Sequence, residues 1–248
     1  MCLVLFAVGA HPEYPLVVAA NRDEFYRRPA LPVHHWDEDP RVVAGRDLEA
    51  DGTWLGISAA GRFAAVTNYS DLVDSAPLSR GALTASFLTG DMTAEDYASS
   101  IHGPSYRGFN LLLWDGYHMV YVSNKAPMRR LRPGTYGLSN AALGSEWPKV
   151  LRGRSVLQSV LRHTPTSQKL LNLLNDDSVP PDHELPDRGR PLEMERRIAP
   201  CFIRGDEYGT RASSSVIFTH EHVSIAEQLY GPGGTPGDHR ELVLPWSR

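Results

Sequence analysis

The chain has 248 residues, of which 42% are hydrophobic and 22% are charged, and its formal net charge at pH 7 is −4. A chain of this length can bury a substantial core, and we expect one globular domain over residues 1–248. The slightly acidic balance excludes a general nucleic-acid binder, because phosphate neutralisation requires a basic face. Small molecules are therefore the expected partners.

The first seventy residues contain two predicted hairpins. Apolar runs at 2–8 and 16–20, separated by the turn-prone segment 9–13, predict a buried hairpin that begins at residue 2. A second hairpin is predicted over residues 54–68, and the proline-punctuated segment 29–40 between the two is expected to be a loop. The apolar start lacks a basic leader and is too short to span a bilayer, so we assign it to the fold and expect no stable membrane insertion.

The rest of the chain alternates between helical and strand patterns. Segments with helical apolar spacing are 79–89, 94–100 and 147–162. Segments that predict strands, bounded by turn signals, are 110–114, 117–124, 136–139, 213–219 and 222–227. Residues 176–191 are rich in Pro and Asp without periodicity and predict a mobile connector. Strands at both ends with helices in two blocks indicate a layered α+β domain.

Cys2 is the first residue that could carry chemistry. Its small side chain permits removal of Met1, which would leave a thiol and a free α-amine on one residue. An α-amine has a reference pKa of about 7.7 to 8.0, so it can accept the thiol proton near neutral pH. A small apolar residue that starts a buried strand is the alternative. The other cysteine, Cys201, is expected to be a buried thiol. Two cysteines are too few for a disulfide framework and fit a reducing compartment, and we therefore expect a cytoplasmic protein.

Four polar residues, Asn21-Arg22-Asp23-Glu24, follow the second apolar run. An antiparallel hairpin would return them to the neighbourhood of Cys2. A guanidinium beside a thiol lowers its pKa, and an aspartate can hold an α-ammonium. A solvated polar turn with an internal ion pair is the alternative for the tetrapeptide taken alone.

Sequence blocks along nearly the whole chain resemble the NRDE family, also called the transport-and-Golgi-organisation family. The blocks are Asn21-Arg22-Asp23-Glu24-Phe25-Tyr26, Arg28-Pro29, Ala44-Gly45-Arg46-Asp47, Gly52-Thr53-Trp54-Leu55-Gly56-Ile57, Thr67-Asn68, Ser79-Arg80-Gly81, Phe109-Asn110-Leu111, Gly137-Leu138-Ser139-Asn140 and Tyr208-Gly209-Thr210-Arg211. The same layout more distantly resembles penicillin V acylases, bile-salt hydrolases and acid ceramidase, which are N-terminal cysteine amidases. This resemblance implies an N-terminal-nucleophile hydrolase fold, a four-layer αββα sandwich of mostly antiparallel sheets.

The wider resemblance also implies roles for single residues. Cys2 matches the nucleophile, Asn68 and Asn140 match asparagines of the oxyanion region, and Arg211 matches a late arginine near the thiol. An asparagine NH2 aimed at a developing oxyanion stabilises it strongly in a dry site. Capping of backbone groups at strand ends is the alternative for the two asparagines.

The second strand departs from the amidase pattern. The amidases carry an Arg and an Asp separated by two residues, whereas here the two are adjacent and a Glu follows. We assign the catalytic roles to Arg22 and Asp23 and keep Glu24 open. The residues predicted to contact a ligand are Asn21, Glu24, Trp54 and Tyr69.

Two functions follow from these resemblances. The first is hydrolysis of an amide or thioester by Cys2, which requires no cofactor. The second is binding and intracellular trafficking on the same fold, because the NRDE family is linked to movement of haem and to handling of lipids or acyl-coenzyme A. Haem would then be a bound cargo. We predict no metal site, since the sequence has no His-Glu-x-x-His spacing.

Overall fold

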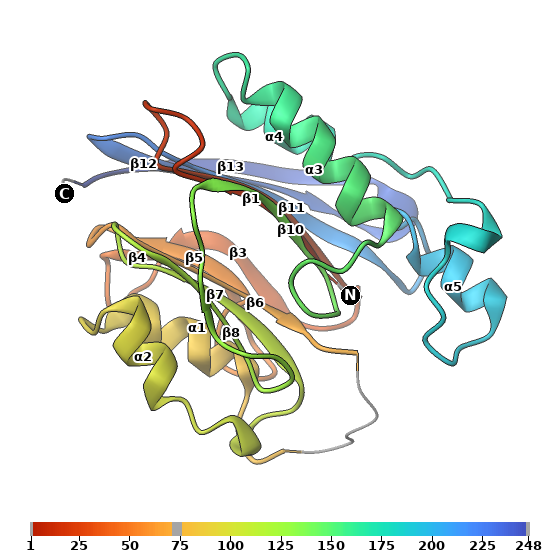
Figure 1. Ribbon diagram of the computed structural model, residues 1–248, viewed down its shortest axis with the longest axis horizontal. Coiled ribbons are helices and arrows are strands. Elements are labelled where there is room, and N and C mark those ends of the chain that lie inside the picture. The colour runs from red at the N-terminus through yellow and green to blue at the C-terminus, as the bar shows by residue number, and fades with distance from the viewer. Residues whose placement is uncertain (1, 71–75, 247–248) are drawn as a thin grey trace.

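The computed structural model describes residues 2–70 and 76–246. Two antiparallel β-sheets pack face to face, and helices cover the outer face of each sheet (Figure 1). The layers therefore run helix, sheet, sheet, helix. This is the αββα sandwich of N-terminal-nucleophile hydrolases that the sequence resemblance implied.

The sheet that contains the start of the chain, here called sheet A, has six strands in the order β10-β1-β2-β11-β12-β13. Their bounds are β1 Cys2–Val8, β2 Leu16–Phe25, β10 Gly134–Leu138, β11 Tyr208–Phe218, β12 His222–Tyr230 and β13 Pro236–Pro245. The predicted hairpin at the start of the chain is confirmed as β1 and β2. Because β1 pairs with β10 on one side and β2 on the other, Cys2 begins an interior strand.

The other sheet, sheet B, is a meander of seven strands in chain order. Their bounds are β3 Ala30–His35, β4 Val42–Asp47, β5 Leu55–Ser58, β6 Arg62–Asn68, β7 Phe109–Trp114, β8 Met119–Ser123 and β9 Arg129–Arg130. The prediction of a loop over residues 29–40 is wrong for the part that forms β3. Pro32 is tolerated there because β3 is an edge strand whose pairing with β4 shifts register between Leu31 and His34.

Four helices cover the sheets and a fifth lies apart. Sheet B carries α1 (Arg80–Thr89) and α2 (Ala94–Ser100), and sheet A carries α3 (Pro148–Val160) and α4 (Ser167–Leu173). The short α5 (Leu192–Ile198) lies beside the end of sheet A at which β1 begins (Figure 1). Three 3-10 turns occupy 103–105, 182–184 and 232–234. Over the described ranges, no helix has the length and apolar character needed to cross a membrane.

Alternation along β1 decides which way Cys2 faces. Val4 and Phe6 pack into the core between the two sheets, whereas Leu3 and Leu5 pack against the helices outside sheet A. Successive side chains of a strand point to opposite faces. Cys2 therefore shares the inter-sheet side with Val4, at the end of the core.

Candidate functional site

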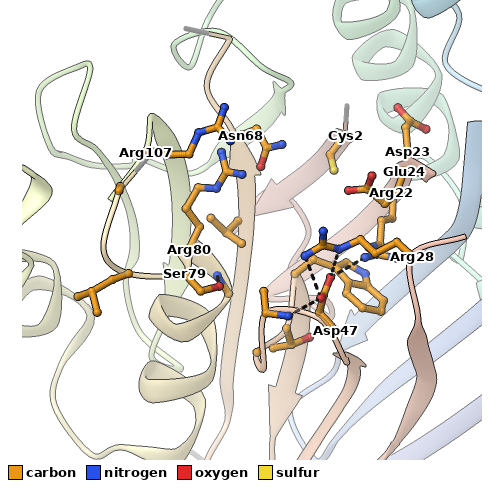
Figure 2. Close-up of a pocket in the computed structure, with 18 of the residues that line it drawn as sticks. Cys2, Arg22, Asp23, Glu24, Arg28, Asp47, Asn68, Ser79, Arg80 and Arg107 are labelled. Carbon is orange, nitrogen blue, oxygen red and sulfur yellow. Dashed lines mark hydrogen bonds and ion pairs between the residues drawn. The ribbon is translucent and has the colours of Figure 1, made fainter. Parts of the chain in front are cut away.

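Cys2 lines a cavity of about 350 Å³ between the ends of the two sheets (Figure 2). Its backbone nitrogen donates to Oδ1 of Asn140 at 3.1 Å, across 138 positions of sequence. Its carbonyl oxygen accepts a hydrogen bond from Ser139 Oγ at 2.8 Å. The end of β10 therefore fixes the backbone of the candidate nucleophile on both sides.

The two predicted oxyanion asparagines lie at the site but have different contacts. The Nδ2 of Asn140 donates to the carbonyl of Asn68 at 2.8 Å, so both polar groups of Asn140 are engaged and neither is aimed into the cavity. Asn68 ends β6 and is exposed, and its side chain lies across the cavity from Cys2 (Figure 2). Asn140 thus holds the nitrogen of residue 2, whereas Asn68 presents its side chain to the cavity.

The Cys2 thiol needs a base in order to act as a nucleophile. Burial raises its pKa and the charge of Asp23 raises it further, and the nearby Arg22 guanidinium opposes this rise only in part. The thiol is therefore protonated at neutral pH. If Met1 is removed, the nitrogen bound by Asn140 becomes an α-amine on the same residue, where it can accept the thiol proton.

Arg22 lies opposite Cys2 in the β1–β2 ladder and is buried. Its guanidinium donates to Asp47 at 2.9 Å and stacks 4.1 Å from the centre of the Trp54 ring. Arg28 donates to both carboxylate oxygens of Asp47, at 2.7 and 3.0 Å (Figure 2). Burial opposes the ionisation of Asp47, but the hydrogen bonds from Arg28 and the Ala50 backbone N–H, together with the charges of Arg28 and Arg22, outweigh it and lower the pKa. One carboxylate therefore fixes two guanidiniums of the cavity.

Asp23 and Glu24 line the same cavity with opposite degrees of exposure. Asp23 is 2% exposed, and its Oδ1 accepts a hydrogen bond from Thr210 Oγ1 at 2.7 Å. Burial raises the pKa of Asp23, against the opposing effect of that hydrogen bond. Glu24 is half-buried and accepts from the Phe25 backbone N–H at 2.9 Å. Asp23 is therefore the buried acid of this cavity, and Glu24 is the more exposed one.

A second cavity, of about 530 Å³, adjoins the first. The residues that line both are Glu24, Asn68, Arg80 and Arg107. The apolar and aromatic side chains of the second cavity are Phe25, Tyr69, Met194, Ile198, Ile203 and Tyr208, and its other arginines are Arg190 and Arg197. Two predicted ligand contacts therefore divide between the cavities, with Trp54 in the first and Tyr69 in the second.

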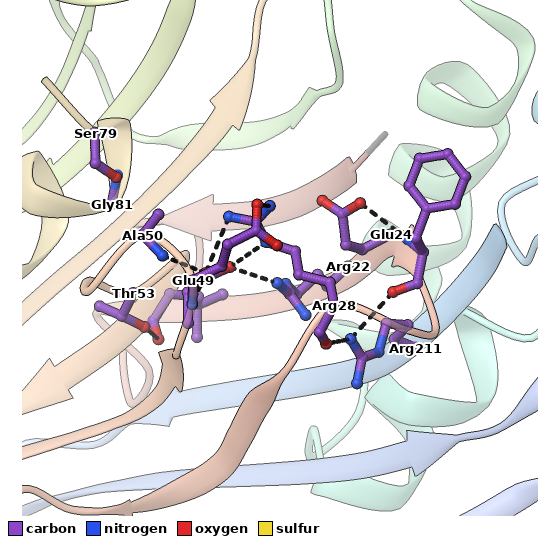
Figure 3. Close-up of polar contacts among 12 residues, drawn as sticks. Arg22, Glu24, Arg28, Glu49, Ala50, Thr53, Ser79, Gly81 and Arg211 are labelled. Carbon is purple, nitrogen blue, oxygen red and sulfur yellow. Dashed lines mark hydrogen bonds and ion pairs between the residues drawn. The ribbon is translucent and has the colours of Figure 1, made fainter. Parts of the chain in front are cut away.

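Two predicted site residues have other contacts. The guanidinium of Arg211 donates to the backbone carbonyls of Phe25 and Arg28, and Arg211 is not among the described residues that line either cavity (Figure 3). Asn21 is buried, and its Nδ2 donates to the carbonyls of Leu174 and Cys201. Arg211 thus secures the turn after β2, and Asn21 joins sheet A to the helical layer instead of contacting a ligand.

The sequence prediction gave no role to several residues that build the site. Arg28, Asp47, Arg80 and Ser139 all lie within the family blocks, so their polar character inside those blocks was an available signal. Arg197 of α5 and Arg190 of the preceding connector lie outside every block, so no motif indicated that they line a cavity. Among the described residues, no group of three or more His, Cys, Asp or Glu side chains is arranged to hold a metal ion.

The known structures that resemble this chain share its fold. A Caenorhabditis elegans N-acylethanolamine-hydrolyzing acid amidase ortholog aligns with a TM-score of 0.52 and 11% identity, over 87% of this chain and 92% of that one. The C2A mutant of conjugated bile acid hydrolase from Clostridium perfringens aligns with a TM-score of 0.53 and 8% identity, over 98% and 92%. At such identities the likeness shows the fold alone, which is that of N-terminal-nucleophile hydrolases.

Curated relatives match almost the full length at higher identity. A Transport and Golgi organization protein 2 homolog from Bos taurus is 35% identical over 257 residues, covering 92% of this chain and 92% of the relative. The Homo sapiens homolog is 34% identical over 255 residues with the same coverage. The family model described as Transport and Golgi organisation 2 matches residues 1–232. The chain therefore belongs to the Transport and Golgi organisation 2 family, as its sequence blocks indicated.

Proposed function

We propose that the protein hydrolyses amide or thioester bonds, with Cys2 as the nucleophile after Met1 is removed. One observation carries the proposal. The backbone nitrogen of Cys2 is held by Asn140 while its side chain lines a cavity that has Asn68 on the opposite wall. Thiol, amine and amide donor would then surround one small volume, as acyl transfer requires.

The reaction balances within this group of residues. The Cys2 sulfur attacks the carbonyl carbon of the substrate and forms a C–S bond, while the thiol proton passes to the α-amine. The carbonyl electron pair moves to the oxygen, which the Asn68 NH2 stabilises. The intermediate expels an amine or a thiol, which takes the proton from the α-ammonium. Water then cleaves the acyl-enzyme, with the α-amine as base, releasing an acid and restoring the thiol.

The names of the structural neighbours support this choice. One neighbour is described as an acid amidase and the other as a bile acid hydrolase. Both cysteines of the chain are free thiols, which supports action in a reducing compartment such as the cytoplasm.

The intact mass of the untagged protein tests the nucleophile. We expect Met1 to be absent, and brief exposure to a thiol-directed acylating reagent to add one acyl group. Cys2→Ala should add none, whereas Cys201→Ala should behave as wild type because Cys201 is buried and its pKa is raised to about 12 by burial. Retention of Met1, or an inert Cys2, would rule out the mechanism. A positive result leads to screening of acyl amides and acyl thioesters.

The second cavity favours a second candidate, which is binding and delivery of an acyl ligand without hydrolysis. Its aromatic and apolar wall suits an acyl chain, and its arginines suit an anionic head group. For haem as cargo, the described residues that line the two cavities include no histidine. An axial ligand there would be the Cys2 thiolate or a tyrosine such as Tyr69 or Tyr208.

Ligand titration of Cys2→Ala separates the two candidates. A pure carrier should bind a fluorescent long-chain carboxylate, and haem followed by absorbance, without any turnover in the wild type. A hydrolase should turn over a related amide or thioester in the wild type and lose this activity in the variant. Turnover that persists in Cys2→Ala would contradict both.

A further inference from the structure

Asn110 of β7 is a fully buried polar residue to which the proposed hydrolysis gives no role. Leu112, two residues later in the strand, belongs to the core between the two sheets, so Asn110 faces sheet A. Burying an amide in such a layer is costly unless its hydrogen-bonding groups find partners. The partners of Asn110 should therefore explain why an amide lies between two apolar sheet faces.

Asn110 binds the short segment that follows β10 in sheet A. Its Nδ2 donates to the carbonyl of Ser139 at 3.3 Å and to that of Ala141 at 3.1 Å, so it holds the backbone on both sides of Asn140. Thr67, which lies opposite Asn110 in the pairing of β6 with β7, donates from Oγ1 to the same Ser139 carbonyl at 2.7 Å. Two neighbouring strands of sheet B thus hold the segment after β10.

Tyr121 of β8 fixes the direction of the Asn110 amide. Its hydroxyl donates to Oδ1 of Asn110 at 2.8 Å and accepts from the Leu143 backbone N–H at 3.3 Å. Because the tyrosine hydroxyl occupies the oxygen of the amide, the NH2 group faces the carbonyls after β10. The ring of Tyr121 is buried in the core between the sheets, and a buried network whose groups are bonded to one another is rigid.

The segment that Asn110 holds carries two groups that bind Cys2. Oδ1 of Asn140 accepts from the Cys2 nitrogen at 3.1 Å, and Ser139 Oγ donates to the Cys2 carbonyl at 2.8 Å. The Nδ2 of Asn140 donates to the carbonyl of Asn68, the last residue of β6. Hydrogen bonds depend steeply on distance and angle. A displacement of this segment against sheet B would therefore change how Cys2 lies relative to Asn68 across the cavity.

We propose that Asn110 is a positioning residue that aligns Cys2 with Asn68 by holding Asn140. Asn110 is not among the described residues that line either cavity, so its effect on the reaction must pass through the residues that it binds. A misplacement of about 1 Å can slow a reaction about 10²-fold, and the hydrogen bonds of Asn110 oppose such a displacement. The catalytic consequence rests on the proposed function, because it requires a reactive Cys2.

Acylation of the untagged protein by p-nitrophenyl acetate, followed by release of nitrophenol, tests the catalytic consequence, with Cys2→Ala as the background. Asn110→Leu nearly keeps the shape of the side chain but loses its hydrogen bonds, and we expect acylation of Cys2 to slow at least about tenfold. Asn140→Ala should also slow it. The double variant should be no slower than Asn140→Ala alone, because residues that act as one unit are not additive. Multiplied losses in the double variant would overturn the proposal.

Tyr121→Phe covers the case in which Asn110→Leu does not fold. It removes only the hydroxyl that binds Asn110, and we expect acylation to slow about threefold or more. The matched control is Tyr97→Phe, which removes a hydroxyl hydrogen bond of the same length, from Tyr97 of α2 to the Leu83 carbonyl at 2.8 Å. Its acylation should match that of the wild type. Equal rates in the two tyrosine variants would contradict the proposal.

A measurement that needs no activity separates this proposal from the hydrolysis. Exchange of the Asn140 side-chain NH2 with solvent is followed by 15N NMR, with Asn140→Asp identifying the signal. We expect exchange at least about tenfold faster in Asn110→Leu than in the wild type or Tyr97→Phe. Faster exchange in a protein whose Cys2 is inert would support the positioning of Asn140 and reject the hydrolase. A reactive Cys2 with unchanged exchange and unchanged acylation in Asn110→Leu would support the hydrolase and reject the role of Asn110.

Discussion

The two adjoining cavities differ in how their arginine side chains are fixed. In the first, Arg22 and Arg28 are both bonded to Asp47 and come from strand β2 and the turn that follows it. In the second, Arg190 and Arg197 are exposed and come from the connector and α5. Fixed charges in a confined site stabilise charge that develops during a reaction, whereas exposed charges attract anionic ligands from solution. Under the proposed hydrolysis, we assign chemistry to the first cavity and ligand recognition to the second.

The largest expected effect is loss of acyl transfer in Cys2→Ala. Turnover should fall by at least about 10³-fold, because the nucleophile is removed. Affinity of the second cavity for a fluorescent long-chain carboxylate should change by less than about threefold, since Cys2 is not among the described residues that line it. Parallel turnover and fluorescence titrations check this, with Cys201→Ala as control. If binding is lost together with turnover, the division into two cavities fails.

The second effect concerns Glu227, a buried acid near the charges of the first cavity. Its Oε2 accepts the Val33 backbone N–H at 2.8 Å, and burial raises its pKa to about 7, with Arg22 among the charges that oppose the rise. Because the folded-state pKa exceeds the unfolded value of about 4.3, its contribution to stability is present at low pH and is lost as the pH rises through 7.

The wild type should therefore lose on the order of 3 kcal/mol of unfolding free energy between pH 5 and pH 8, as Glu227 ionises. Glu227→Gln should not show this loss. The Gln side chain keeps an acceptor for Val33 but cannot ionise. Urea unfolding at the two pH values measures the effect. Glu221→Gln is the control, since Glu221 is exposed in the turn before β12. The same pH slope in the wild type and Glu227→Gln would show that the ionisation of Glu227 does not limit stability.

The third effect tests whether the arginines of the first cavity are fixed. Asp47→Asn should lower the unfolding free energy by about 1 to 3 kcal/mol, because two guanidiniums lose a shared carboxylate. The matched control is Glu49→Gln. Glu49 also bonds Arg28, at 2.9 Å, but is 60% exposed, so its loss should cost no more than about 0.5 kcal/mol. Equal losses in the two variants would mean that burial of the ion pair has no special value.

The smallest effect belongs to the second cavity. Arg197→Ala should weaken binding of an anionic acyl ligand about tenfold at low salt, and less at high salt, because exposed charges are screened. Its neighbour Arg196 does not line the cavity and instead pairs with Asp182 at 2.7 Å, so Arg196→Ala is the matched control. Binding titrations at two salt concentrations decide the matter, and equal weakening in both variants would argue against a binding role for Arg197.

Much of the fold could be predicted because local patterns specified it. The hairpin of β1 and β2, the hairpin of β5 and β6 and helix α1 all combine a clear period with a turn or capping signal. Strands β3 and β13 were missed because prolines and glycines at sheet edges resemble loop sequence. Asn21-Arg22-Asp23-Glu24 lies inside β2 and not after its end, since pairing with β11 nearly two hundred residues later extends the strand.

The sequence predicted which residues lie at the site better than it predicted which way their side chains point. Cys2, Arg22, Asp23 and Asn68 line the first cavity as their order in the chain suggested. Asn21, in contrast, donates to carbonyls of the helical layer, on the face of β2 opposite to that of its neighbour Arg22.

The bonds that define the site join positions far apart in the chain. Cys2 and Asn140 are 138 residues apart, and Asp23 and Thr210 are 187 apart. Closing such long loops is slow and becomes favourable only when the surrounding structure is in place. We therefore expect the candidate site to be among the last parts of the molecule to form during folding. A fragment that ends before β11 lacks Thr210 and therefore the hydrogen bond to Asp23. We expect the reactivity of Cys2 during refolding to report completion of the site.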